Sequence, residues 1–251
     1  MRFRALCALL ALLSLVPAGA GQVTAAVASN FAVAAEDIGD RFTAQTGHEI
    51  RISTASTGVL YAQIVNGAPF DVLLAADSER PRLLEEAGEG VAGTRFTYAV
   101  GRLVLWSRDE KLAGMDCRAR LEDLGRDRLA IANPRTAPYG NAAREFLQGA
   151  GLWDRVSPRL VFGENIAQTL QFVATGNATL GLIAQSQAVD PRLPKATCSW
   201  PVPETSHTTL EQQTILLNRA IENVAARDLL EFLKSRAAQQ IILRHGYSVQ
   251  R

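Results

Sequence analysis

Short apolar runs alternate with amphipathic segments through the first part of the chain. The run 23–28 predicts a strand, and in the segment after it apolar residues recur at helical spacing, at Phe31, Ala34, Ala35, Ile38 and Phe42. Further strands are predicted at 50–53 and 71–76, and helices are predicted to begin near Thr57 and Ser78. Strands that alternate with helices across short connections are typical of a parallel α/β sheet.

The same alternation restarts after a longer extended segment at 98–107. Strands are predicted at 129–132, 160–162, 179–183 and 213–217. A proline-rich stretch at 191–203 precedes the last of these, and the helices 222–233 and 236–243 complete the chain. We therefore predict two α/β lobes, one made of residues 21–100 and 208–251 and the other of residues 101–207.

Residues 1–20 have the pattern of a secretory signal peptide. Arg2 and Arg4 provide a basic start, residues 5–16 form an apolar run, and Ala18-Gly19-Ala20 predicts cleavage after Ala20. The apolar run is short for a membrane span, although a retained signal anchor is the alternative. We expect the mature chain to be soluble and to lie outside the cytoplasm.

Charge and cysteine content narrow the class of partner. Loss of Arg2 and Arg4 leaves 24 basic against 25 acidic residues, and no basic run is interleaved with aromatic residues. Nucleic acid is therefore not an expected partner. Cys117 and Cys198 remain in the mature chain; in an oxidising compartment they could form one disulfide or stay as two buried thiols.

Four predicted junctions between a strand or loop and a helix share one physical character. They are Ser29-Asn30, Thr57-Gly58, Tyr139-Gly140 and Asn165-Ile166. A helix N-terminus offers unpaired N–H groups and a partial positive charge, and in an open α/β sheet such junctions lie at the ligand-binding edge. Two facing lobes could aim all four at one dianion without any Lys or Arg. Each junction taken alone is also explained by ordinary helix capping.

The sequence offers no comparable pattern for catalysis or for a resident metal. No G-x-S-x-G motif is present, and His48, His207 and His245 have no Cys or His partner at metal-binding spacing. We expect these histidines to be exposed or lightly packed. The prediction is a binding protein with no catalytic residues and no cofactor.

Several segments, in order, carry a family resemblance. They are AVASNF (26–31), STGVLYAQI (56–64), GAPFDV (67–72), the loop from Asn133-Pro134 to Pro138-Tyr139-Gly140, GENI (163–166), LGL (180–182) and residues 241–247, which end in His-Gly-Tyr. Together they resemble the periplasmic molybdate-binding proteins of ABC transporters. The similarity runs through most of the mature chain.

The resemblance implies a type II periplasmic-binding-protein fold, with two lobes joined by two chain crossings. It also implies that an oxyanion, molybdate or tungstate, is closed between the lobes and passed to a membrane permease, and that molybdenum is held only as this oxyanion. Its contacts would come from Ser29, Asn30, Thr57, Tyr139 and the backbone N–H of Ile166, with Ser56 and Gly58 as secondary candidates. We expect a monomer.

One departure from the family concerns its tyrosine. Some members place a tyrosine where this chain has Ala184, and those members have a small residue where Tyr139 stands here. An exchange of one tyrosine for the other would preserve the number of donors. Three alternatives stay open: a binding protein for another oxyanion such as sulfate, a ligand sensor for a membrane kinase, and a periplasmic enzyme on the same fold.

Overall fold

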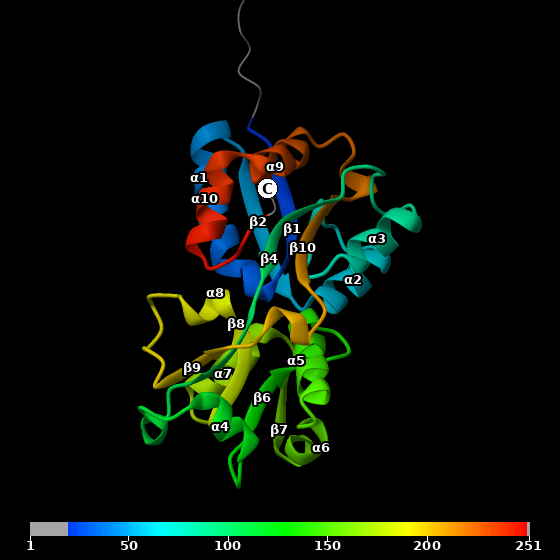
Figure 1. The fold of residues 1–251 in the computed structure, drawn as a ribbon. Coiled ribbons are helices and arrows are strands. Elements are labelled where there is room, and N and C mark those ends of the chain that lie inside the picture. The colour runs from blue at the N-terminus through cyan, green and yellow to red at the C-terminus, as the bar shows by residue number, and fades with distance from the viewer. Residues whose placement is uncertain (1–19, 250–251) are drawn as a thin grey trace, which may run out of the picture.

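The computed structural model describes residues 20–249 and divides them between two lobes placed one above the other (Figure 1). Each lobe has a five-stranded sheet flanked by helices. The predicted signal peptide, apart from Ala20, lies outside the described residues. Within residues 20–249, no helix is long and apolar enough to cross a membrane.

The sheet of the first lobe combines two distant parts of the chain. Its strand order is β2 (Glu49–Ala55), β1 (Gln22–Ala28), β3 (Val72–Leu74), β10 (Leu210–Leu216) and β4 (Phe96–Gly101). The pairs β1–β2 and β1–β3 are parallel, whereas β10 is antiparallel to both of its neighbours. The sheet is therefore mostly parallel, with one late strand inserted into it.

Helices cover both faces of this sheet. They are α1 (Ala32–Thr46), α2 (Thr57–Val65), α3 (Glu79–Glu86), α9 (Val224–Lys234) and α10 (Arg236–Arg244). One apolar cluster joins α1, α9 and α10 to the sheet, and a second joins α2 and α3 to it. The amphipathic pattern of α1 ends at Gly47, whose φ of 75° favours glycine. The two C-terminal helices thus pack against the sheet of the first lobe.

The second lobe repeats this plan with residues from the middle of the chain. Its strand order is β7 (Leu160–Gly163), β6 (Leu129–Ala132), β8 (Leu180–Ala184), β5 (Leu103–Ser107) and β9 (Cys198–Pro201). Its helices are α4 (Cys117–Glu122), α5 (Pro138–Gly149), α6 (Trp153–Val156), α7 (Ile166–Ala174) and α8 (Gln185–Ala188). Strands β6 and β8 are buried along their whole length, as expected for strands covered on both faces.

The sulfur atoms of Cys117 and Cys198 are bonded to each other, which settles the open choice between a disulfide and two thiols. The bond joins α4 to β9 inside the second lobe. The indole of Trp200, next to this bond, lies under the guanidinium of Arg118 at 5.5 Å and beside the ring of Phe146. The disulfide therefore fixes the edge of one lobe and leaves the connection between the lobes free.

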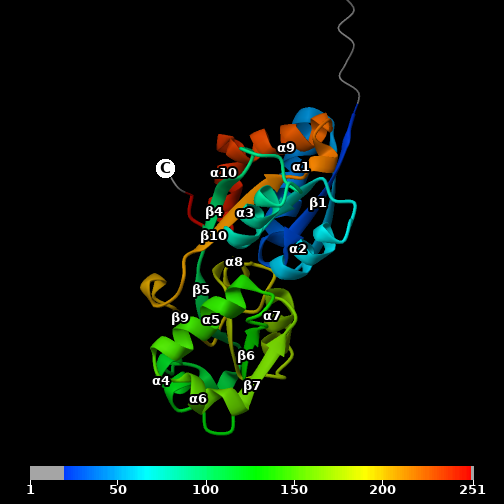
Figure 2. The same ribbon diagram turned by 90° about the vertical axis from the view of Figure 1, so that its right-hand side faces the viewer.

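The chain crosses between the lobes twice (Figure 2). The first crossing is at Arg102, where the extended segment predicted at 98–107 divides into β4 and β5 because its two halves pair with different sheets. The second crossing, residues 202–209, contains a short 3-10 helix, η4 (Glu204–Ser206). Glu145 of α5 accepts a hydrogen bond from the N–H of Thr208 at 2.6 Å and so holds this crossing against the second lobe.

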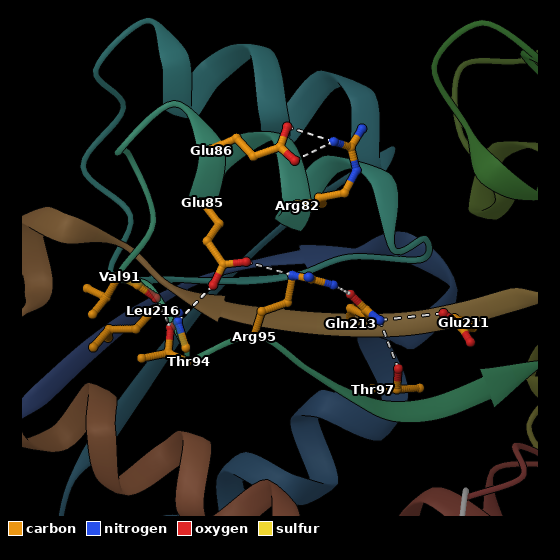
Figure 3. Close-up of polar contacts among 11 residues, drawn as sticks. Arg82, Glu85, Glu86, Val91, Thr94, Arg95, Thr97, Glu211, Gln213 and Leu216 are labelled. Carbon is orange, nitrogen blue, oxygen red and sulfur yellow. Dashed lines mark hydrogen bonds and ion pairs between the residues drawn. The ribbon is translucent and has the colours of Figure 1, made fainter.

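A β-bulge interrupts β10 between Gln212 and Gln213, close to the second crossing. Gln213 accepts a hydrogen bond from Arg95 at 2.9 Å and donates one to the hydroxyl of Thr97 at 2.9 Å, and Figure 3 shows this cluster on the first lobe. Gln212 is fully buried and bonds instead to Asn30. The bulge thus carries one glutamine that bonds to Arg95 and Thr97 and one that bonds to Asn30, near the lobe interface.

Candidate functional site

The four predicted junctions meet in one small cavity between the two lobes. Its lining, which we call the inner cavity, consists of Ala28, Ser29, Asn30, Ser56, Thr57, Ala76, Ala137, Pro138, Tyr139 and Ile166. The cavity is very narrow, with a volume of about 10 Å³. All five principal residues predicted from the sequence, and Ser56, are therefore brought together. They come from the carboxyl ends of β1 and β2 in the first lobe and from the starts of α5 and α7 in the second.

Gly58, the other secondary candidate, is not in this lining. Its N–H donates a hydrogen bond of 2.8 Å to the carbonyl of Thr136, across the gap between the lobes. A Cβ atom at position 58 would lie 2.8 Å from the same carbonyl oxygen, so a side chain would separate the lobes here. Glycine at this position serves the contact between the lobes rather than the cavity itself.

The hydroxyls at the start of α2 differ in how they are used. The Ser56 hydroxyl is buried and has no hydrogen-bond partner among the described residues. The Thr57 hydroxyl oxygen accepts the N–H of Ala76 at 2.9 Å, so its position is fixed while its own hydrogen stays available. Ser56, which the sequence ranked second, is therefore the residue whose whole hydroxyl is uncommitted.

Tyr139 is buried in the first turn of α5. Its hydroxyl lies beside Gly101, Gln212 and the Asn30 side chain but makes no hydrogen bond of proper geometry within the described chain. Burial raises the pKa of this hydroxyl well above its usual value, and the phenols of Tyr247 and Tyr98 add to the shift. The hydroxyl therefore keeps its proton and acts as a neutral donor.

Asn30 uses its side chain for structure. Gln212 donates its amide hydrogen to the carbonyl of Leu210 at 2.9 Å, so it turns its oxygen toward Asn30. The Asn30 NH₂ group donates to that oxygen at 2.7 Å and to the hydroxyl of Tyr247 at 3.0 Å. Both amide hydrogens are thereby used, which leaves the backbone N–H as the donor that Asn30 can offer to a ligand.

Ile166 begins α7 and offers only its backbone. The side chain of Asn165 accepts the N–H groups of Ala167 and Gln168, both at 3.0 Å, as an N-cap does. The N–H of Ile166 precedes both and has no intrahelical acceptor. Glu164 is exposed and outside the cavity lining, as expected of a carboxylate that a bound anion would repel.

The electrostatic character of the inner cavity comes from the backbone. No Lys, Arg, Asp or Glu belongs to its lining within residues 20–249. The N-termini of α2, α5 and α7 are there instead, and each contributes a partial positive charge and unpaired N–H groups. Such a site can hold a small anion with neutral donors alone.

A second and larger hollow, which we call the outer groove, adjoins the inner cavity at Ala76, Ala137 and Pro138. Its other lining residues are Asp77, Ser78, Glu79, Arg80, Pro134, Arg135, Asn141, Ala142, Arg144, Thr208, Thr209 and Leu210. Charged side chains of both signs are therefore next to the inner cavity, at its edge and not in its lining.

The remaining polar candidates of the sequence lie elsewhere. His48 is buried, accepts the N–H of Gly21 at 2.9 Å and faces Asp228 at 3.1 Å, so the expectation of an exposed or lightly packed side chain is wrong for it. The bond to Gly21 joins residues 27 positions apart and the contact with Asp228 joins residues 180 positions apart, which the sequence pattern could not reveal. No group of three or more His, Cys, Asp or Glu side chains suited to a metal occurs in the described part of the chain.

Known proteins are similar to this chain in sequence and fold. The family model of the bacterial extracellular solute-binding proteins matches residues 23–248. The molybdate-binding protein ModA of Rhodobacter capsulatus is 43% identical over 231 residues, which is 92% of this chain and 90% of the relative. ModA of Azotobacter vinelandii is 44% identical over 233 residues, 93% of this chain and 92% of the relative.

Among solved structures, the periplasmic molybdate-binding protein of Azotobacter vinelandii superimposes with a TM-score of 0.86 at 34% identity. The match covers 91% of this chain and all of that structure. The two sheets, their flanking helices and the two crossings are thus those of a two-lobed periplasmic binding protein. The chain belongs to the bacterial extracellular solute-binding proteins, in the family of the periplasmic molybdate-binding proteins.

Proposed function

We propose that this protein binds molybdate between its two lobes in the periplasm and delivers it to the membrane permease of an ABC importer. It is a binding protein and not an enzyme, and molybdate is its ligand, not a cofactor. The observation that carries the proposal is the inner cavity, where helix N-termini and uncommitted hydroxyls converge and no charged side chain belongs to the lining formed by the described residues. The relatives that cover most of the chain are molybdate-binding proteins.

The proposed contacts divide between the lobes. From the first lobe, Ser29 and Ser56 donate through hydroxyls, Thr57 donates the hydrogen of its fixed hydroxyl, and Asn30 donates its backbone N–H. From the second lobe, Tyr139 donates through its phenol and Ile166 through its backbone N–H. The buried hydroxyls of Ser56 and Tyr139, which have no hydrogen-bond partner among residues 20–249, support this assignment, because buried polar groups are nearly always hydrogen-bonded.

The absence of a carboxylate from the described lining of the inner cavity favours a fully ionised dianion. A protonated oxyanion such as hydrogen phosphate needs an acceptor for its proton, whereas molybdate presents acceptors only. Tungstate has nearly the same size and charge, so we propose that it competes for the same donors. Sulfate has the same charge on a smaller frame and serves as the test of cavity size.

We further propose that the mature chain begins after Ala20, acts as a monomer, and forms lobe I from residues 21–100 and 208–251 and lobe II from residues 101–207. Closure around the anion would bring both lobes into one surface for the permease. A sensor that reports to a membrane kinase would bind the same anion, and the protein that it contacts separates the two roles.

The test is a calorimetric titration of residues 21–251 with molybdate, tungstate, sulfate and phosphate. We expect binding of molybdate and tungstate and much weaker or no binding of sulfate and phosphate. Stabilisation of the folded state by each ligand should follow the same order, because a ligand stabilises the state that it binds. Binding of another anion in place of molybdate and tungstate would overturn the assignment.

A further inference from the structure

Three residues beside the inner cavity join the lobes through hydrogen bonds. The hydroxyl of Ser186, in α8 of the second lobe, donates to the carbonyl oxygen of Asn30 in the first lobe at 3.0 Å. The hydroxyl of Tyr247, which follows α10, donates to the same oxygen at 2.7 Å. The Tyr247 and Ser186 oxygens are 3.1 Å apart. We call Asn30, Ser186 and Tyr247 the interlobe latch.

Two of the three latch residues, Asn30 and Tyr247, are held in place within the first lobe. Tyr247 is buried, and its ring packs edge-on against Phe31 with the ring centroids 5.3 Å apart. Its hydroxyl also accepts a hydrogen bond from the Asn30 side chain. Asn30 and Tyr247 therefore form a preassembled pair that needs only one group from the other lobe.

The second lobe is shaped to meet this pair. Gly246, next to Tyr247, has a φ of 76°, and a Cβ atom there would lie 3.1 Å from a methyl group of Val189 and 3.3 Å from the side chain of Gln185. The turn that carries Tyr247 thus rests directly on α8. This contact is separate from the bond between Gly58 and Thr136, so the lobes touch at two places around the cavity.

We propose that the interlobe latch sets the balance between open and closed lobes and thereby the rate at which the ligand leaves, a role that rests on the proposed function. Ser186 does not belong to the lining of the inner cavity, so it acts on the ligand only through closure. When the lobes separate, Ser186 loses its hydrogen bond to the Asn30 carbonyl and its contact with the Tyr247 oxygen, and water replaces them. The hydrogen bond of Ser186 therefore stabilises the closed form alone, whereas the bonds between Asn30 and Tyr247 lie within the first lobe.

The fraction of protein in the closed form determines the apparent affinity for the ligand. If the ligand is held only when the lobes are closed, the apparent dissociation constant equals the intrinsic constant divided by the closed fraction. A weaker latch lowers that fraction and accelerates opening, while the donors that face the ligand stay the same. Ser186 and Tyr247 are therefore positioning residues whose loss raises the release rate.

The decisive variant is Ser186→Ala, which deletes the bonding group of the second lobe and leaves a small side chain. We expect ligand release, measured by stopped flow against a molybdate trap, to become about three- to tenfold faster, the effect of one or two ordinary hydrogen bonds. The rate of capture should change much less. The matched control is Ser157→Ala, whose hydroxyl bonds to Asp154 within the second lobe and whose loss should leave both rates unchanged.

A second measurement tests the effect of the latch on lobe separation in the ligand-free protein. Small-angle X-ray scattering of the ligand-free protein should show a larger radius of gyration for Ser186→Ala and for Tyr247→Phe than for wild type and Ser157→Ala. Because this comparison needs no molybdate, failure of the proposed ligand leaves it intact. Unchanged scattering together with an unchanged release rate in Ser186→Ala would overturn the latch.

Discussion

The inner cavity and the outer groove share three residues but differ in chemistry. The inner cavity presents hydroxyls and backbone N–H groups and, among the described residues, no charged side chain in its lining. The outer groove carries Asp77, Glu79, Arg80, Arg135 and Arg144. Arg80 already pairs with Asp77 and Glu79, so part of this charge is neutralised within the protein.

The difference shows how an anion site can do without cations. A buried Lys or Arg would attract any anion, whereas fixed neutral donors bind tightly only an anion whose oxygen atoms match their positions. The helix N-termini contribute partial charges that need no counter-ion and are held in place by the fold. Selection is thus expected in the inner cavity, and the outer groove is expected to tolerate changes of charge.

The largest effect is expected when a carboxylate enters the inner cavity. Ser56 and Ser78 both precede helices, α2 and α3, so Asp at either position still suits a helix N-cap. Ser56→Asp should weaken molybdate binding by at least about a hundredfold, because it places an uncompensated charge beside the dianion. Ser78→Asp, in the outer groove, should change the affinity by less than about threefold. Equal losses of molybdate affinity in the two variants, measured by calorimetry, would contradict the proposed difference between the inner cavity and the outer groove.

Tyr139→Phe tests a neutral donor of the inner cavity. Affinity should fall by about 1–3 kcal/mol, the cost of a ligand oxygen left without its donor. Stability of the ligand-free protein should stay the same or rise, since the hydroxyl has no hydrogen-bond partner among residues 20–249 to lose. Denaturant unfolding without ligand and calorimetry with molybdate measure the two effects. A loss of stability with unchanged affinity would show that the hydroxyl supports the first crossing between the lobes, beside Gly101, and does not bind the ligand.

Removal of the two hydroxyls at the start of α2 should likewise have different effects on affinity and on stability. Thr57→Ala should lower both affinity and the free energy of unfolding, the latter by about 1–3 kcal/mol, because the buried N–H of Ala76 loses its acceptor. Ser56→Ala should lower affinity alone, by about 1 kcal/mol. Thermal unfolding and titration of the two variants provide the comparison, which similar stability losses in both would contradict.

The smallest effect concerns pH and the outer groove. Burial raises the pKa of the Asp77 carboxyl above its ordinary value of 3.8, against the opposing hydrogen bond and charge of Arg80. The folded state therefore binds this proton more tightly than the unfolded state. The contribution of Asp77 to stability is then largest at low pH and falls as the pH rises from 3.8 through the raised pKa.

Asp77→Asn removes this titration. The free energy of unfolding of the variant, relative to wild type, should increase as the pH rises through that window. Chemical denaturation at a series of pH values measures the difference. Parallel curves for the two proteins would show that Asp77 does not titrate differently in the folded state.

The convergence of the four junctions could be predicted from the sequence because it depends on local pattern. An apolar run followed by helical spacing locates each junction, and parallel strands bring such junctions to one edge of a sheet. Ser29, Thr57, Tyr139 and Ile166 were found in this way, and the structure brings them into one cavity. The two-lobed fold followed from the same alternation and from the family resemblance.

Other features depend on contacts that no local pattern contains. The different uses of Ser56 and Thr57 are decided by the N–H of Ala76, which belongs to another strand–helix connection. The amide of Asn30 is occupied by Gln212 and Tyr247, which are 182 and 217 residues away. Ser186 lies in a short helix with no distinctive motif, so its bond to Asn30 becomes visible only when the lobes are placed together.

The most direct test is a crystal structure of the molybdate complex with the metal located by anomalous diffraction. We predict one molybdenum atom in the inner cavity, with its oxygen atoms hydrogen-bonded to the hydroxyls of Ser29, Ser56, Thr57 and Tyr139 and to the backbone N–H groups of Asn30 and Ile166. No Lys or Arg nitrogen should be within hydrogen-bonding reach. A molybdenum position in the outer groove, against Arg135 or Arg144, would contradict the claim that neutral donors alone hold the anion.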